Sequence, residues 1–180
     1  MEENVFLVRW YGPFKTQEEE VEWEKKQKFK CSLYLIHGKL KYAKSREMYY
    51  CGESTRDIYK RFRDKDHHIN EIKERLNSIY VGCIFNINHP TRKQIMLIEK
   101  IVTAYLAECV GQENMLNATN FYYPNKNVYV INEWWKINGV TIWNRQPINA
   151  PSHIVPDVLT YHCLDNNNIE IFGCRKLKRL

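Results

Sequence analysis

The sequence predicts an α+β fold in which a small, mainly antiparallel sheet of three strands is flanked by helices. Two short apolar runs, residues 31–36 and 48–51, are separated by a polar, basic segment, which is the pattern of a hairpin with a long loop. A third run, residues 79–87, is apolar enough for a central strand. Between and after these strands apolar residues recur at helical spacing, so helices are expected to cover the sheet.

Helices are expected at three places in this part of the chain. Ser54 or Thr55 can cap a first helix whose apolar positions lie four residues apart, and a second is expected over residues 68–77. The strongest helical pattern begins at Thr91 and ends before Gly111, a typical residue just past a helix end. Its apolar face consists of Ile95, Ile98, Ile101, Val102, Tyr105 and Leu106.

Residues 1–30 are expected to form a strand-helix extension in front of this sheet. Residues 5–10 alternate like a strand, which Gly12-Pro13 is expected to close. Thr16 is followed three residues later by a glutamate, the pattern of a capping box, so a helix is expected from there to about Lys30.

The chain after residue 120 is expected to form a small β-rich element, which leaves residues 31–120 as the central domain and 121–180 as the third part. The four segments that resemble strands are VYVINEWW, VTIWN, VLTYHCLD and IEIFGC. The last two flank three consecutive asparagines, a favourable hairpin turn.

Composition restricts the classes of protein to which the chain can belong. It has 180 residues, 44% of them hydrophobic, which fits one domain with extensions and a real core. No apolar run is long enough to span a bilayer, and the N-terminus is acidic, so we expect a cytoplasmic protein without membrane contact. The net charge of +6 suits a polyanionic partner.

The cysteines are expected to be reduced thiols in apolar segments rather than metal ligands or disulfides. They lie far apart and form no CxxC pair, at positions Cys31, Cys51, Cys83, Cys109, Cys163 and Cys174.

One set of residues resembles the GIY-YIG nuclease family. Two tyrosine tripeptides, Ser32-Leu33-Tyr34 and Tyr50-Cys51-Gly52, lie in the first two predicted strands. Arg61 follows on the basic helix, Glu99 lies in the apolar helix, and Asn117 comes after it. No single residue is specific, but their order, spacing and structural context together are similar to that family over roughly half of the chain.

The sequence departs from the family pattern at three points. Ser32 stands where the family usually has glycine, and Cys51 where it usually has isoleucine. The loop between the two tripeptides is also longer than usual. All of these changes can be accommodated in strands or loops, and none of them removes a catalytic group.

The resemblance implies a role for each of these side chains. Glu99 would hold one Mg²⁺ or Mn²⁺ ion, and Arg61 would bind the phosphate that gains charge in the transition state. Tyr34 would be the general base and Tyr50 would position the phosphate. A tyrosine base needs its pKa lowered from about 10, so a cation has to lie nearby. The structural alternative for Glu99 is a buried ion pair with a lysine or arginine.

An auxiliary catalytic group is expected just after the basic helix. Family members often carry a histidine or lysine there, and Lys65, His67 and His68 are the alternatives, with His67 placed in the catalytic set. His37 is a second-tier candidate because it lies between the two tyrosine strands. The remaining histidines, which are expected to be structural or exposed, are His89, His153 and His162.

We therefore expect a metal-dependent endonuclease of restriction, mobile-element or phage type, with DNA favoured over RNA and a homodimer compatible with double-strand cutting. The alternative is a non-catalytic nucleic-acid-binding module with the same fold. The residues expected to bind nucleic acid are Lys39, Lys41, Lys44, Arg46, Arg56, Lys60, Arg63, Lys65 and Asn117.

Overall fold

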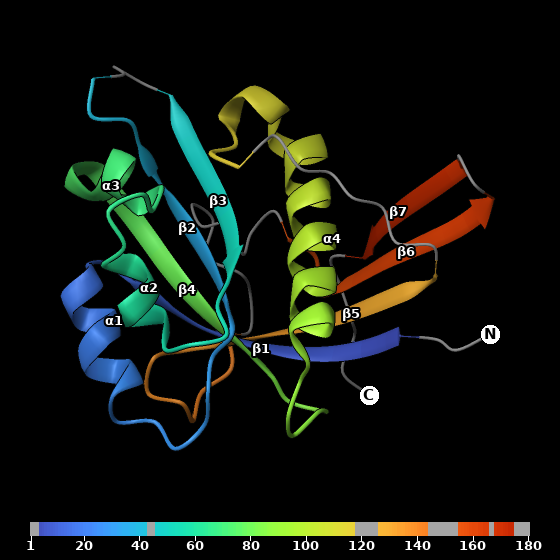
Figure 1. The fold of residues 1–180 in the computed structure, drawn as a ribbon, viewed down its shortest axis with the longest axis horizontal. Coiled ribbons are helices and arrows are strands. Elements are labelled where there is room, and N and C mark those ends of the chain that lie inside the picture. The colour runs from blue at the N-terminus through green and yellow to red at the C-terminus, as the bar shows by residue number, and fades with distance from the viewer. Residues whose placement is uncertain (1–3, 43–45, 118–125, 144–154, 166–167, 175–180) are drawn as a thin grey trace.

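The structure is a computed structural model, and it shows an α+β protein built on one mixed sheet (Figure 1). It describes the backbone of residues 4–42, 46–117, 126–143, 155–165 and 168–174, and the side chains of this set up to residue 163. Seven strands lie in the order β3-β2-β4-β1-β5-β6-β7. The predicted class is therefore confirmed, whereas a sheet of three strands is too small.

The three predicted strands are all present and lie together at one end of the sheet. They are β2 (Leu33–Lys39), β3 (Glu47–Glu53) and β4 (Leu76–Ile84). β2 lies between the other two and pairs antiparallel with both, as predicted. None of the described strands lies on the outer side of β3, so it is the edge strand at this end of the sheet.

β1 (Asn4–Phe14) lies in the middle of the sheet and is not a peripheral strand. It pairs antiparallel with β4 and parallel with β5 (Val128–Trp135). The prediction that Gly12-Pro13 closes the strand is wrong, because the strand continues to Phe14. Proline cannot donate a ladder hydrogen bond, and the pairing with β4 changes register between Tyr11 and Phe14, which accommodates it.

The C-terminal strands extend the same sheet. β6 (Val158–Asp165) pairs antiparallel with β5, and β7 (Asn168–Cys174) pairs antiparallel with β6. The predicted strand VTIWN is wrong within the described residues, where only Ile142 forms an isolated bridge with Trp135. The sheet crosses the proposed boundaries at residues 30 and 120, and these boundaries stay predictions.

The two longest helices begin where their caps predict. α1 (Gln17–Glu24) starts after Thr16, whose side chain accepts a hydrogen bond from the Glu19 amide at 3.2 Å. It ends earlier than the predicted Lys30. α4 (Arg92–Val110) starts with a capping box between Thr91 and Gln94, and Gly111 follows its end with φ 88°.

The helical segments between β3 and β4 are shorter than predicted. α2 (Ile58–Phe62) starts after Asp57, not after Ser54 or Thr55, and α3 (Ile69–Ile72) passes into the 3₁₀ turn η1 (Lys73–Arg75). Ser54 instead closes a turn, since its hydroxyl accepts from the Arg56 amide at 3.2 Å. A second 3₁₀ turn, η2 (Gln112–Asn114), follows α4.

Helices cover both faces of the sheet at the β3-β2-β4-β1 end (Figure 1). The apolar face of α4 packs with Trp10, Leu33 and other residues on one side. Residues of α2 and α3, among them Ile58 and Ile69, pack with Tyr34 on the other side. Because β3 is an edge strand, groups from both layers can meet around it. None of the described helices is long and apolar enough to cross a membrane.

Candidate active site

A cleft of about 330 Å³ lies beside the edge strand β3, between α2 and α4. Four residues of the sequence-predicted site line it together: Tyr50 from β3, Arg61 from α2, Glu99 from α4, and Asn117 from the segment after η2. The fold thus brings residues from four separate parts of the chain to one cavity. The hydroxyl, guanidinium, carboxylate and amide groups of these residues are of the kinds that bind phosphates and divalent cations.

The glycine of the Tyr50-Cys51-Gly52 tripeptide is required by the packing of the first tyrosine. Tyr34 and Gly52 are paired across the β2–β3 ladder. A Cβ atom on Gly52 would overlap the ring and hydroxyl of Tyr34. The two tripeptides therefore fit each other: the missing side chain of one strand provides the space for the tyrosine of the other.

Tyr34 lies behind the cleft rather than in its lining. Its side chain is 0% exposed, whereas Tyr50 is 8% exposed and lines the cavity. The two rings stack with their centroids 5.8 Å apart. Of the two tyrosines, Tyr50 is the one placed to touch a bound substrate.

His67 holds the hydroxyl of Tyr34, and its own tautomer is determined by the backbone. The Ile69 amide donates to Nδ1 of His67 at 3.0 Å, so Nδ1 carries no proton. Burial lowers the pKa of His67 to about 4, with help from the charges of Arg61 and His68. The neutral ring therefore carries its proton on Nε2, which donates to Tyr34 Oη at 2.8 Å.

The pKa values of both tyrosines are raised in the free protein. For Tyr34 the causes are burial first and then the charge and hydrogen bond of Tyr50, while Arg61 acts in the opposite direction. For Tyr50 burial again dominates over the effects of Tyr34 and Arg61. Arg61 is the cation that a tyrosine base requires, but its effect is smaller than that of burial.

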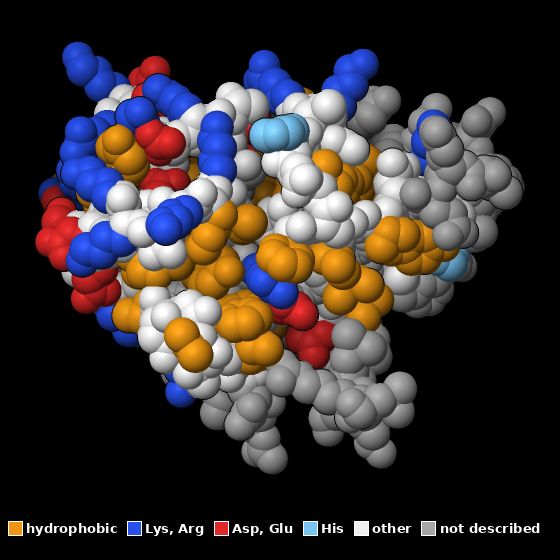
Figure 2. Space-filling view, turned by 90° about the horizontal axis from the view of Figure 1, so that it is seen from below, with side chains coloured by type: hydrophobic (Ala, Val, Ile, Leu, Met, Phe, Trp, Pro, Cys, Tyr) orange, Lys and Arg blue, Asp and Glu red, His pale blue; other side chains and the backbone are white. Residues whose placement is uncertain are grey.

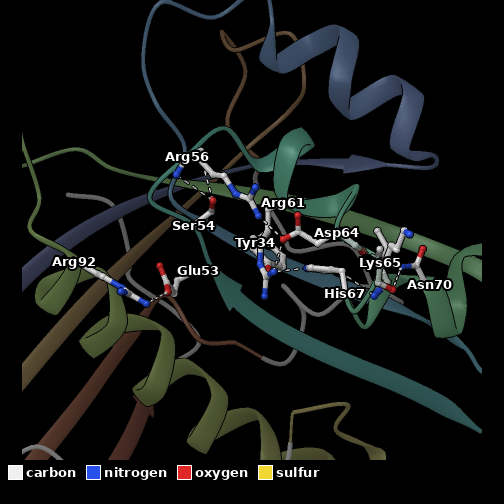
Figure 3. A network of polar contacts seen from close by, with 11 residues as sticks. Tyr34, Glu53, Ser54, Arg56, Arg61, Asp64, Lys65, His67, Asn70 and Arg92 are labelled. Atoms are coloured by element: carbon white, nitrogen blue, oxygen red, sulfur yellow. Dashed lines mark hydrogen bonds and ion pairs between the residues drawn. The ribbon is translucent and has the colours of Figure 1, made fainter.

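Arg61 is held by Asp64, one turn further along the chain (Figure 3). Its Nη1 lies 2.5 Å from Asp64 Oδ2, and Arg56 pairs with the same oxygen. The hydrogen bond from Arg61 keeps the pKa of Asp64 below its ordinary value. A single carboxylate therefore orients two guanidinium groups, one of which, that of Arg61, belongs to the cleft lining, where a phosphate would compete for it.

Glu99 has a carboxyl group whose pKa is raised to about 7. Burial is the main cause, and the negative charge of Glu53 adds to it, while Lys100 and the Thr103 hydroxyl act against the rise. Its Oε1 atom accepts only long hydrogen bonds, 3.5 Å from Thr103 Oγ1 and 3.5 Å from Asn117 Nδ2. The carboxylate is thus weakly satisfied by the protein and turned toward a cavity.

Asn117 is fixed against β3 by the chain segment that follows η2. The Leu116 amide donates to Tyr49 O at 2.9 Å, and Asn117 Nδ2 donates to Cys51 O at 2.6 Å. The amide oxygen Oδ1 of Asn117 is buried and has no hydrogen-bond partner within the part of the chain that the structure describes. Within the described residues no group of three or more His, Cys, Asp or Glu side chains could hold a metal ion, so any cation in this cleft would rely on fewer carboxylates and on other oxygens.

The three candidates for the auxiliary group lie in different places. His67 contacts Tyr34, as described above. His68 lines the cleft with its ring 5.2 Å from that of Tyr50, and its Nδ1 lies 2.6 Å from Glu71 Oε1. Lys65 is exposed and does not line the cleft.

The basic loop between β2 and β3 is remote from the cleft. β3 has seven residues, so the loop lies roughly 20 Å from Glu53 at the other end of that strand. Its cations are engaged with acidic or polar groups, namely Lys39 with Glu47, Lys41 with Glu74, and Arg46 with Asn114. Lys44 lies outside the described residues, and the role of this loop in binding nucleic acid stays a prediction.

The basic residues of α2 gather around Tyr59. The charged groups of Lys25, Lys60 and Arg63 lie 5.5–5.6 Å from the centre of its ring. Lys60 also pairs with Asp57 at 2.6 Å. Figure 2 shows many Lys and Arg side chains at the end of the molecule where α1 and α2 lie, on the left in both views.

The other histidines and the cysteines lie outside the cleft lining. His37 is buried against Tyr49 and pairs with Glu47 at 2.6 Å, His89 is exposed, and the ring of His162 lies 5.9 Å from that of Tyr129. His153 lies outside the described residues. All cysteines whose side chains are described are free, with Cys31, Cys51 and Cys83 buried.

Sequence reasoning missed four polar residues around the cleft. Lys100 and Thr103 line it from α4, one and four positions after Glu99, and Asp64 holds Arg61 from three positions away. Residues three or four positions apart are neighbours on the surface of a helix, so the spacing of Asp64 from Arg61 and of Thr103 from Glu99 could have indicated these positions. Glu53 also lines the cleft, and its only signal was its place directly after the tripeptide glycine.

Comparison with known proteins assigns no family to this chain. No protein-family model, no curated protein and no solved structure matches it. The resemblance to the GIY-YIG nucleases, carried by Tyr34, Tyr50, Arg61 and Glu99, therefore stays a prediction. The function of the cleft has to be inferred from the side chains that line it.

Proposed function

We propose that this chain is a GIY-YIG-type endonuclease that hydrolyses phosphodiester bonds in DNA with one divalent cation per active site. The observation that supports it most is the meeting of Tyr50, Arg61, Glu99 and Asn117 in one cleft. Each residue type is common, but a phosphate-binding cation, a cation-binding carboxylate and a hydroxyl for a water molecule seldom converge by chance.

Arg61 is the group proposed to bind the scissile phosphate. Its guanidinium stays protonated and offers a planar pair of donors that matches two phosphate oxygens. Asp64 holds it in place before substrate arrives, and a phosphate takes over one of its donors. As negative charge grows on the phosphate, this hydrogen bonding becomes stronger.

Tyr50 is proposed to orient the attacking water. Its hydroxyl belongs to a rigid strand and faces the cleft, whereas Tyr34 is fully buried behind it. This assignment reverses the roles implied by the resemblance, in which Tyr34 was the base. Tyr34 and His67 instead support the position of the Tyr50 ring through stacking and the Tyr34–His67 hydrogen bond.

Glu99 is proposed to hold the divalent cation. Its carboxylate has only long hydrogen bonds within the protein, so an oxygen-seeking cation fits its chemistry. Mg²⁺ or Mn²⁺ bound there would supply positive charge beside the leaving oxygen. The alternative, an ion pair with Lys100, is less favourable because adjacent residues of a helix such as α4 do not face each other.

DNA is favoured over RNA by the resemblance alone, and the positive surface at α1 and α2 suits either polyanion. A single cleft of this kind cuts one strand at a time. Double-strand cutting would therefore involve a homodimer or two successive nicks. The cluster of Lys25, Lys60 and Arg63 around Tyr59 is the surface best placed to follow the phosphate backbone away from α2.

The test is cleavage of a supercoiled plasmid in the presence of Mg²⁺ or Mn²⁺. We expect nicking by the wild-type chain and its loss in Glu99→Ala and Arg61→Ala. Glu108→Ala is the matched control, since Glu108 is exposed on the same helix and does not line the cleft. Nicking at the wild-type rate by both cleft variants would show that the proposed site is wrong.

A non-catalytic binding module is the second candidate, and one observation favours it. Asp64 pairs with both Arg56 and Arg61, and the pKa values of the two tyrosines are raised, so neither the phosphate-binding arginine nor a tyrosine base is ready for catalysis in the free cleft. If the wild-type chain binds DNA in a salt-dependent manner yet cuts neither duplex, branched nor single-stranded substrates, this candidate replaces the nuclease.

A further inference from the structure

Glu53 is a half-buried acidic residue of the cleft for which the described residues provide little compensation. It is the last residue of β3 and lines the cavity next to Gly52. Its side chain is 22% exposed, yet its Oε2 atom is buried and has no hydrogen-bond partner among the described residues. A buried carboxylate oxygen without a partner is costly, so such an atom in a cleft calls for a ligand.

The ion pair of Glu53 with Arg92 does not satisfy its carboxylate. Arg92 Nη2 approaches the other carboxylate oxygen, Oε1, only to 4.0 Å, and the Arg92 side chain is largely exposed (Figure 3). An exposed pair at this separation contributes little. Glu53 is therefore placed by its strand, where it is paired with Leu33 of β2, rather than by Arg92.

Asn117 also lines the cleft, where its amide nitrogen Nδ2 lies 3.5 Å from Glu99 Oε1 and 3.5 Å from Thr103 Oγ1. Its Nδ2 donates to Cys51 O on β3, and this bond determines which end of the amide carries the oxygen. The Oδ1 atom is then left buried without a partner. Two orphan oxygens, on Glu53 and Asn117, thus belong to residues lining the cavity that also contains the Glu99 carboxylate.

We propose that Glu53 is a second carboxylate ligand of the divalent cation, and that Asn117 Oδ1 is a third oxygen donor beside Glu99. This inference rests on the proposed function, because it concerns the cation of that same cleft. It extends that proposal from a single carboxylate to a set of three oxygens on β3, on α4 and after η2. Carboxylate and amide oxygens are the donors that Mg²⁺ and Mn²⁺ prefer.

The charges in the cleft agree with this assignment. Glu53 of β3 and Glu99 of α4 both line the same cavity, so the two carboxylates face one space. Two negative groups facing one cavity repel each other, and a dication between them removes that repulsion. Lys100 and Arg61 line the same cavity, which leaves room for one cation but disfavours a second.

The test measures Mn²⁺ binding directly, by electron paramagnetic resonance of the free ion and by calorimetry, on the full chain without nucleic acid. The variants are Glu53→Gln, Glu99→Gln and the exposed control Glu108→Gln. We expect one Mn²⁺ site in the wild-type chain, an affinity at least about tenfold weaker in Glu53→Gln, and no change in Glu108→Gln. Arg92→Gln should not weaken binding, because Arg92 is a cation at the edge of the site.

The outcomes separate this inference from the proposed function. Weakened binding in Glu99→Gln together with wild-type affinity in Glu53→Gln would overturn the role of Glu53 and leave the nuclease proposal intact. Absence of Mn²⁺ binding by the wild-type chain, or wild-type affinity in Glu99→Gln, would overturn both. Circular dichroism and the thermal midpoint of each variant verify folding, and Asn117→Asp, which keeps an oxygen donor, should bind Mn²⁺ at least as tightly as wild type.

Discussion

Glu99 and Glu20 are both glutamates whose pKa is raised by burial, and each has a second glutamate beside it. The pKa of Glu99 is about 7, with Glu53 as its neighbour, and the pKa of Glu20 is about 9, with Glu24 as its neighbour. Glu99 lines a cleft that also contains cations. Glu20 lies on α1, is 0% exposed, and does not line that cleft.

The neighbours of these two residues differ more than the residues themselves. The Glu24 carboxylate accepts hydrogen bonds from the amides of Ile58 and Tyr59 at 3.0 and 2.9 Å, so it attaches α1 to the start of α2. Glu53 Oε2 has no such partner. A raised pKa and a nearby carboxylate therefore do not by themselves indicate a functional site. Both carboxylate oxygens of Glu20 are also buried without a hydrogen-bond partner among the described residues, so access to the cleft is what distinguishes Glu99 from Glu20.

The largest difference between variants of Glu99 and variants of Glu20 is expected in the rate of DNA cleavage. Glu99→Gln should reduce the rate of plasmid nicking by about a thousandfold, because it removes the charge that holds the cation. Glu20→Gln should nick at the wild-type rate, since its side chain contacts no part of the cleft. A comparable loss of nicking in both variants would contradict the conclusion that access to the cleft distinguishes Glu99 from Glu20.

The next largest difference between the Glu20 and Glu99 variants is expected in the free energy of unfolding and in its dependence on pH. A carboxyl group whose pKa is higher in the folded state destabilises the protein as pH rises from its unfolded value to its folded value. For Glu20 this window runs from about 4.5 to 9, and for Glu99 only to about 7. Glu20→Gln should therefore raise the free energy of unfolding by about 3 kcal/mol at pH 7, with a gain that keeps growing to pH 9.

Urea denaturation at pH 5, 7 and 9 in the presence of EDTA measures this effect. The gain from Glu99→Gln should level off above pH 7, whereas that from Glu20→Gln should not. Equal curves for the two variants would contradict the difference in burial on which the comparison rests.

The smallest effect is expected at acid pH and has the opposite sign. The pKa of His67 is lowered to about 4 by burial, by Arg61 and by His68, so its contribution to stability is present above about 6.5 and is lost as pH falls toward 4. The wild-type chain should lose about 2 kcal/mol through this residue between pH 7 and pH 5. The stability difference between wild type and His67→Gln should shrink by that amount, and a constant difference would exclude a buried neutral imidazole.

Local sequence signals were sufficient for the elements that build the cleft. The caps of α1 and α4, the two tyrosine strands and the position of Glu99 on an apolar helix all follow from neighbouring residues. The central place of β1 did not follow, because its pairing of Val8 with Asn132 joins residues that are far apart in the sequence. The β-strand propensity of the residues in β1 does not indicate which other strand will pair parallel with it.

The parts of the site that sequence reasoning could not supply depend on orientation. Tyr34 and Tyr50 pack in the same cluster as Ile58 of α2, and Tyr50 lines the cleft because its strand, β3, lies outside β2 in the sheet. The tautomer of His67 is decided by the Ile69 amide. The orphan oxygens of Glu53 and Asn117 can be recognised only after every neighbouring donor has been placed.

The most direct measurement of the central claim is anomalous diffraction from crystals of the chain soaked in Mn²⁺. The account predicts one strong anomalous peak in the cleft, within coordination distance of the Glu99 carboxylate, with Glu53 and Asn117 Oδ1 as further ligands. A well-soaked crystal with no peak in the cleft, or with the peak on an exposed acidic side chain away from β3 and α4, would contradict it.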